Sequence, residues 1–136
     1  MMPRPLRILL CAQAVDMRAS FDRLTELVVD RLDEDPTTEE TLFVFINGRR
    51  DRAKILWRDS TGFCLLYKRL DTRFFAVPEI PTDVTHITMD ASALAILLEG
   101  AVEAPPTRPT NRDIARAARA LVKKRIAMSQ NPQLSS

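Results

Sequence analysis

The feature that most constrains the fold is a series of short, strongly β-prone segments between Leu42 and Pro78, separated by turn sequences. Aromatic and β-branched residues favour strands, and the Asn47-Gly48 pair is typical of tight turns because both residues tolerate positive φ. A second turn runs from Asp59 to Gly62. The expected strands are Thr41–Ile46, Ile55–Asp59, Phe63–Leu70 and Arg73–Val77. Short strands joined by short turns predict an antiparallel β-meander.

Because these strands are mostly apolar, the meander needs a cover on at least one face, and two amphipathic segments can supply it. Apolar residues recur at helical spacing from Phe21 to Leu32, with Asp16 as the expected N-cap. A shorter helix is expected over Ala91–Glu99, capped by Asp90 and stopped by Gly100. Further strands are expected at Leu6–Cys11 and Val84–Thr88. The sequence therefore predicts an α+β domain over residues 1–104, a small antiparallel meander covered by one or two helices.

The C-terminal part of the chain is predicted to be separate from this domain. Clustered prolines over residues 105–109 favour an extended linker, residues 110–128 have a helical pattern, and the polar tail 129–136 is expected to be disordered. The predicted helix has a thin apolar stripe and a net charge of +6 over residues 108–125. Its basic stripe consists of Arg112, Arg116, Arg119 and Lys123. Such a helix could bind a DNA backbone or an acidic partner, form a dimer seam, or stay exposed to solvent without a partner.

Several classes of active site are disfavoured by composition. The three glycines are isolated, so neither a P-loop nor a dinucleotide-binding turn is present, and one histidine with two cysteines is too few for a structural zinc site. A metal-dependent nuclease would need clustered carboxylates, and the remote candidates are Asp16, Asp22, Asp51 and Asp59. The expectation is a non-catalytic protein with no metal and no cofactor. No run is long enough to span a membrane, and a cytoplasmic location is predicted.

Charge is segregated along the chain. Residues 16–40 hold nine acidic and three basic residues, a net charge of −6, whereas residues 42–73 hold eight basic and three acidic residues, a net charge of +5. Cations on one face of a meander can neutralise phosphates, and interleaved aromatics can stack on bases. The candidate nucleic-acid contacts are Arg49, Arg50, Arg52, Lys54, Trp57, Arg58, Lys68 and Arg69. Two alternatives stay open: the cations form a solvated hairpin edge, and Trp57 and Tyr67 serve packing.

Several ordered blocks of the sequence resemble one family. They are Ala14–Leu24, Leu42–Phe45, Arg52–Asp59, Gly62–Leu70 and Phe74–Pro78, and together they extend over roughly residues 6–100. This pattern is similar to that of the TnpB-type accessory proteins of the insertion sequence 66 family. The chain departs from it where Arg58 replaces an aromatic residue, where Ser60 replaces a common glycine, and in the extension from Pro105 to Ser136.

The resemblance implies a protein encoded beside a DDE-type transposase and needed for efficient transposition, with no established catalytic activity and no cofactor. The expected partners are DNA, contacted along its backbone through the basic meander, and the cognate transposase. The alternative is a protein–protein interaction module or regulator of the transposase without direct DNA contact. In that alternative the acidic segment and the basic meander would dock a transposase subunit, or a second copy of the chain as a homodimer.

Overall fold

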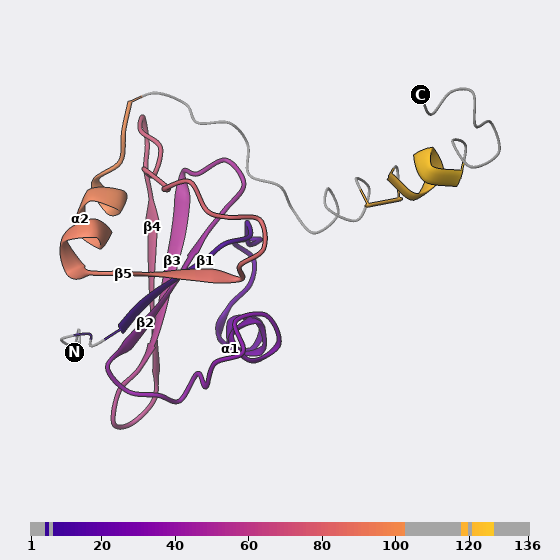
Figure 1. Cartoon of the computed structure of the whole chain (residues 1–136). Coiled ribbons are helices and arrows are strands. Elements are labelled where there is room, and N and C mark those ends of the chain that lie inside the picture. The colour runs from indigo at the N-terminus through magenta and orange to yellow at the C-terminus, as the bar shows by residue number, and fades with distance from the viewer. Residues whose placement is uncertain (1–4, 6, 103–117, 120, 127–136) are drawn as a thin grey trace.

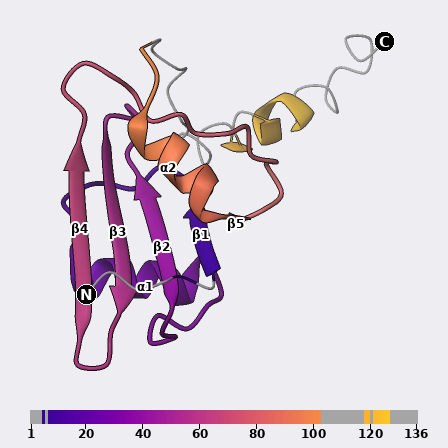
Figure 2. The same ribbon diagram turned by 90° about the vertical axis from the view of Figure 1, so that its left-hand side faces the viewer.

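The computed structural model describes residues 5, 7–102, 118–119 and 121–126, and its main body is a five-stranded sheet with one helix on each face (Figure 1). The strand order is β4-β3-β2-β1-β5. The elements are β1 (Arg7–Cys11), α1 (Phe21–Asp30), β2 (Thr41–Ile46), β3 (Arg52–Arg58), β4 (Phe63–Arg69), β5 (His86–Met89) and α2 (Ala91–Glu99). Figure 2 shows α2 in front of the sheet and α1 behind it. The predicted α+β class is confirmed.

The predicted meander forms one half of this sheet. Strands β2, β3 and β4 pair in sequence as antiparallel neighbours, with Phe43 opposite Leu56 and Lys54 opposite Tyr67. On its other side β2 pairs with β1 in parallel, and β1 pairs with β5 in antiparallel orientation. The sheet is therefore mixed, and the first and the last of its strands along the chain lie side by side.

The sheet separates two hydrophobic layers. Along β2, Phe43 and Phe45 pack toward α1, whereas Val44 and Ile46 pack toward α2, because successive side chains of a strand point to opposite faces. Every residue of β2 is buried. Strands covered on both faces have continuous apolar runs instead of alternation, which explains why the sequence of β2 shows no polar face.

The two helices begin in different ways. For α2 the prediction is confirmed: the Asp90 carboxylate accepts a hydrogen bond from the Ala93 N–H at 2.8 Å, and Gly100 ends the helix with φ of 84°. For α1 the predicted cap is wrong, because the N-cap is Ser20. Asp16 accepts from the backbone N–H of Arg18 at 2.8 Å and closes a turn ahead of the helix.

The β2–β3 connection also differs from the expected tight turn. The two strands are joined by five residues, Asn47–Asp51, and the positive φ of 60° falls on Arg50 and not on Gly48. The side-chain oxygen of Asn47 accepts from the backbone N–H groups of Asp51 and Arg52, each at 3.1 Å. Asn47 therefore organises a wider loop, because its side chain accepts hydrogen bonds from the backbone four and five residues further along.

The segment Arg73–Val77 was expected to be a fourth strand of the meander, and this prediction is wrong. Within the described residues, its ladder pairing is an isolated bridge between Phe74 and Ala101. The Phe75 N–H donates to the carbonyl of Arg50, and the Phe75 side chain is buried in the layer beneath α2. Burial explains the aromatic residue at Phe75, so its β propensity is misleading here.

Asp59 holds the β3–β4 turn together. Its Oδ1 accepts from the backbone N–H groups of Thr61 and Gly62, each at 2.8 Å, and its Oδ2 accepts from the Cys64 thiol. The two backbone hydrogen bonds, followed by the thiol, lower the pKa of Asp59 from 3.8 to about 2. Because hydrogen bonds favour the carboxylate in the folded state, protonation weakens this turn.

This pKa shift predicts a pH-dependent part of the stability. The depressed folded-state pKa stabilises the native state above about pH 4, and this contribution is lost as the pH falls toward 2. Asp59→Asn should therefore unfold at a lower temperature than the original protein at neutral pH, and the difference should shrink between pH 4 and pH 2. Thermal unfolding across this range measures it. A difference that does not depend on pH would contradict the assignment.

Among the described residues no helix is long and apolar enough to cross a membrane. The described part of the C-terminal region, residues 118–119 and 121–126, is helical, and its side chains are exposed. The predicted linker 105–109, the tail 129–136 and the remaining residues of the predicted helix lie outside the described residues.

Candidate functional site

The predicted basic residues of the meander are divided between the two faces of the sheet. Arg52, Lys54 and Arg58 alternate along β3 on the face of α1, and Arg69 lies opposite Arg52 on that same face. Lys68 points to the other face, where its ammonium donates to the carbonyl of Leu98 at the end of α2, at 3.0 Å. The meander cations therefore do not form one surface.

The loop cations also differ from one another. Arg49 is exposed, whereas Arg50 is half-buried, and burial lowers the pKa of its guanidinium. The Nε of Arg50 is buried without a hydrogen-bond partner among the described residues. At the far end of β3, the guanidinium of Arg58 lies 5.1 Å from the centre of the Phe63 ring. These three side chains face three different surroundings.

Trp57 lies in the core. It is 5 % exposed and belongs to the layer beneath α2, together with Ile55 and Leu97. Tyr67 differs from it, because it is 51 % exposed and lies on the opposite face of the sheet. Of the two aromatic residues considered for stacking, only Tyr67 presents its ring at the surface.

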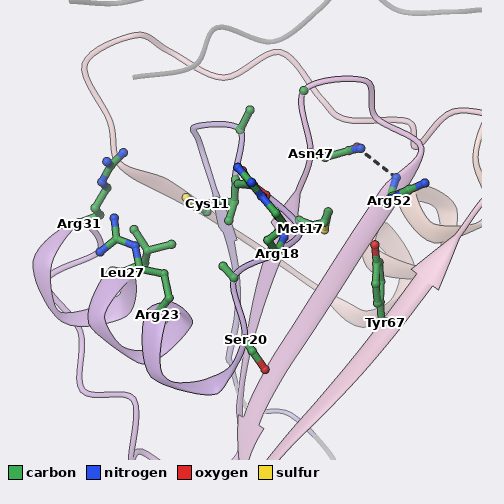
Figure 3. A pocket seen from close by; sticks show the side chains of 15 residues that line it. Cys11, Met17, Arg18, Ser20, Arg23, Leu27, Arg31, Asn47, Arg52 and Tyr67 are labelled. Atoms are coloured by element: carbon green, nitrogen blue, oxygen red, sulfur yellow. Dashed lines mark hydrogen bonds and ion pairs between the residues drawn. The ribbon is translucent and has the colours of Figure 1, made fainter. Parts of the chain in front are cut away.

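The α1 face carries a concave groove with a volume of about 1060 Å³. It lies between α1, the β1–α1 connection, the β2–β3 loop and the ends of β3 and β4. Figure 3 shows Arg23 and Arg31 on one side, Arg52 with Tyr67 on the other, and Arg18 between them. The remaining lining residues are Cys11, Ala14, Val15, Asp16, Met17, Ala19, Ser20, Leu27, Asn47 and Gly48. Four arginines and one aspartate thus border a partly apolar floor, and we call this feature the basic groove.

The partners of these arginines leave much of their charge accessible. Arg18 forms an ion pair with Asp16 at 2.7 Å, and this guanidinium, with the backbone N–H of Arg18, lowers the pKa of Asp16 to about 2. Arg23 pairs with Glu26 at 3.1 Å, one helical turn away. Both pairs are exposed, so each is held weakly and can exchange for another anion.

The other two groove arginines are Arg31, which follows the last residue of α1, and Arg52, at the start of β3. Arg31 donates to the side-chain oxygen of Gln13. The guanidinium of Arg52 has no side-chain partner within the part of the chain that the structure describes, although its backbone N–H donates to Asn47. Arg52 is therefore the groove cation that is most available to a ligand.

A buried lysine lies directly behind the groove lining. Lys54 is 6 % exposed, and its ammonium donates to the carbonyl of Ala19 at 2.6 Å and lies 4.8 Å from the centre of the Tyr67 ring. No salt bridge is formed by this ammonium within the described residues. Because a buried charge acts in a medium of low polarity, Lys54 adds to the positive potential of the groove more than a surface lysine would.

The first turn of α1 adds to this positive potential. Ser20, the N-cap of α1, lines the groove, and its side chain makes no capping hydrogen bond. The first backbone N–H groups of a helix lack internal partners and form its positive end. The carbonyl of Ala19, immediately before the cap, is fixed by Lys54. The helix start is thus held beside the groove by a residue of β3.

Three of the four groove arginines were missed by the sequence analysis. Arg18, Arg23 and Arg31 are the three basic residues of the segment 16–40. Because the net charge of this segment is −6, the segment as a whole did not point to a basic site. A signal was present nonetheless: Arg23, Leu27 and Arg31 follow one another at intervals of four, which puts them on one side of a helix. Of the predicted basic contacts in the described part of the chain, Arg52 lines the groove.

The remaining candidates are more scattered. Of the secondary basic helix, Arg119 and Lys123 are helical and exposed, and Arg112 and Arg116 lie outside the described residues. Among the described residues no three histidines, cysteines or carboxylates come together in a way that could hold a metal ion.

Comparison with known proteins gives one consistent result. The model of a family described as IS66 Orf2 like protein matches residues 6–108. The uncharacterized protein y4jC of Sinorhizobium fredii is 31 % identical over 93 residues, which cover 68 % of this chain and 79 % of that protein. The uncharacterized protein y4hO of the same organism is 32 % identical over 95 residues, covering 70 % and 80 %. No solved structure is significantly similar to the chain.

Proposed function

Because the chain belongs to the IS66 Orf2-like family, which comprises accessory proteins associated with transposition, we propose that it assists transposition by binding DNA through the basic groove. The family has no known catalytic activity, and the role proposed is one of binding. The observation that carries the proposal is the convergence of Arg18, Arg23, Arg31 and Arg52 on one concave surface.

Guanidinium groups suit this task. They form paired, charge-assisted hydrogen bonds with phosphate oxygens and remain charged at any physiological pH. Contacts to the phosphate backbone carry little sequence information, so the binding proposed here tolerates many sequences. This property fits an accessory protein that acts beside a transposase, because target selection can then rest with the transposase.

A second function is favoured by a different observation. The outward side of α1 has three exposed acidic residues, Asp22, Glu26 and Asp30, in a surface that repels phosphates. Such a surface suits a basic protein partner, for which the cognate DDE-type transposase is the candidate. In this alternative the chain acts as an interaction module or regulator and does not contact DNA itself.

The proposal predicts DNA binding with a steep dependence on salt. If all four groove arginines neutralise phosphates, the logarithm of the binding constant should fall with the logarithm of salt concentration with a slope of about −3 to −4. Fluorescence anisotropy with a labelled DNA fragment at several salt concentrations measures this slope. The absence of binding at low salt would overturn the proposal.

A pull-down from the native host separates the two functions. If the chain binds DNA, transposase recovered with it should be lost after nuclease treatment, because the DNA connects the two proteins. Transposase that stays bound after nuclease treatment, together with absence of DNA binding by the purified chain, would support the interaction module instead.

A further inference from the structure

The shape of the basic groove restricts which form of nucleic acid can reach its arginines. The groove is concave, and its cations converge from α1 on one side and from β3 on the other (Figure 3). A duplex is a convex rod that presents its phosphates along two ridges, and it meets protein best through surfaces that project toward it or follow its grooves. A flexible single strand can enter between the two walls.

The surroundings of the groove disfavour a duplex for a second reason. Asp22, Glu26 and Asp30 are exposed on α1, the same helix that supplies Arg23. A rod broad enough to span the groove brings further phosphates toward these carboxylates, and like charges repel. A single strand presents one line of phosphates, which can stay among the arginines.

Tyr67 supplies a platform for a base. Its ring is exposed at the groove, across from Arg23 and Arg31, with Arg18 between them (Figure 3). Lys54 lies toward the ring at 4.8 Å and restrains it from within the protein. Proteins that bind single strands combine a positively charged groove with exposed aromatic rings, because every base has a face that can stack.

From this combination we infer that the basic groove binds single-stranded DNA in preference to duplex, with its phosphates held by Arg18, Arg23, Arg31 and Arg52 and one base stacked on Tyr67. This inference rests on the proposed function and names the form of DNA that the groove takes. In a transposition reaction such strands arise wherever the duplex is opened at an end of the element or at its target.

The test uses the full chain with fluorescein-labelled oligo(dT) and with the same strand annealed to oligo(dA), at equal low salt. The expected result is tighter binding of the single strand. In Tyr67→Ala the affinity for oligo(dT) should fall by about 5- to 100-fold, whereas the affinity for the duplex should change little. Tyr67→Phe, which keeps the ring, is the matched control and should bind like the original protein. Circular dichroism shows whether each variant is folded.

Each outcome has a distinct meaning. Equal or tighter binding of the duplex, or an unchanged affinity of folded Tyr67→Ala for oligo(dT), overturns this inference and leaves the proposed function standing. Loss of oligo(dT) binding in Tyr67→Phe also contradicts stacking, since the phenyl ring is retained. Absence of binding to both oligonucleotides overturns the inference and the proposed function together.

Discussion

Replacing Trp57 by alanine is expected to lower the free energy of unfolding by about 3–5 kcal/mol, the usual cost of removing a buried indole. The side chain is 5 % exposed in the layer beneath α2, where Phe75 and Leu97 also pack, and the cavity left behind could not be filled by small shifts. Urea denaturation of the purified variant measures the loss.

The matched comparison for this prediction is Tyr67→Ala, which removes an aromatic ring from the opposite face of the sheet. Because Tyr67 is exposed, its loss should cost only about 1 kcal/mol, mostly from the contact with Lys54. The variant Trp57→Phe, which stays apolar, should fold and keep its affinity for DNA. A folded Trp57→Phe that no longer binds DNA would show that the indole contacts the ligand after all.

Removing two groove arginines is expected to have the largest effect on binding. In Arg23→Gln/Arg52→Gln, two charge-assisted contacts of about 1.5 kcal/mol each are lost, which corresponds to about a 100-fold weaker affinity at low salt. The slope of the salt dependence should also become shallower by about 1.4 for a single strand, since two fewer phosphates are neutralised. A salt titration by fluorescence anisotropy gives both values.

The control for charge is Arg58→Gln/Arg73→Gln. It removes the same number of positive charges from exposed or half-buried positions that do not line the groove. Its affinity should fall only slightly, because distant surface charges are screened by salt. If the two double variants lose affinity to the same extent, the ligand responds to net charge alone and the groove has no special role.

Parts of the fold followed from the sequence because local chemistry determines them. The helix α2 was predicted with its observed bounds, since Asp90 and Gly100 are a cap and a stop whose effects do not depend on distant residues. The strands β2 and β4 were recognised from their β propensity and from the turn at Asp59. Both strands belong to the half of the sheet, β2 to β4, whose strands follow one another in sequence.

The predictions that were wrong depended on which partner a residue meets, whether near to it in the chain or far from it. Phe75 was assigned to a strand, but its backbone N–H donates to the carbonyl of Arg50 and its ring fills the core. Asp16 has the chemistry of an N-cap, but a turn between it and Ser20 delays the start of α1. Propensity identifies such residues as buried or as capping without showing which partner they meet.

The candidate site was predictable in its chemistry but not in its position. The charge segregation pointed to the meander, whereas the groove takes Arg52 from β3 and its other arginines from the segment with the acidic excess. Only the packing of α1 against the sheet brings these residues together. The sequence shows these arginines, but it does not show that they converge on one groove.

The burial of Lys54 has a consequence for how the groove responds to salt. Mobile ions gather around the exposed arginines and weaken their attraction for phosphates as ionic strength rises, but they do not approach an ammonium enclosed between Ala19 and Tyr67. The attraction of Lys54 for phosphates therefore persists at salt concentrations that weaken the attraction of the exposed arginines. At the high-salt end of the titration, the attraction that remains comes from the charge that the solvent cannot reach.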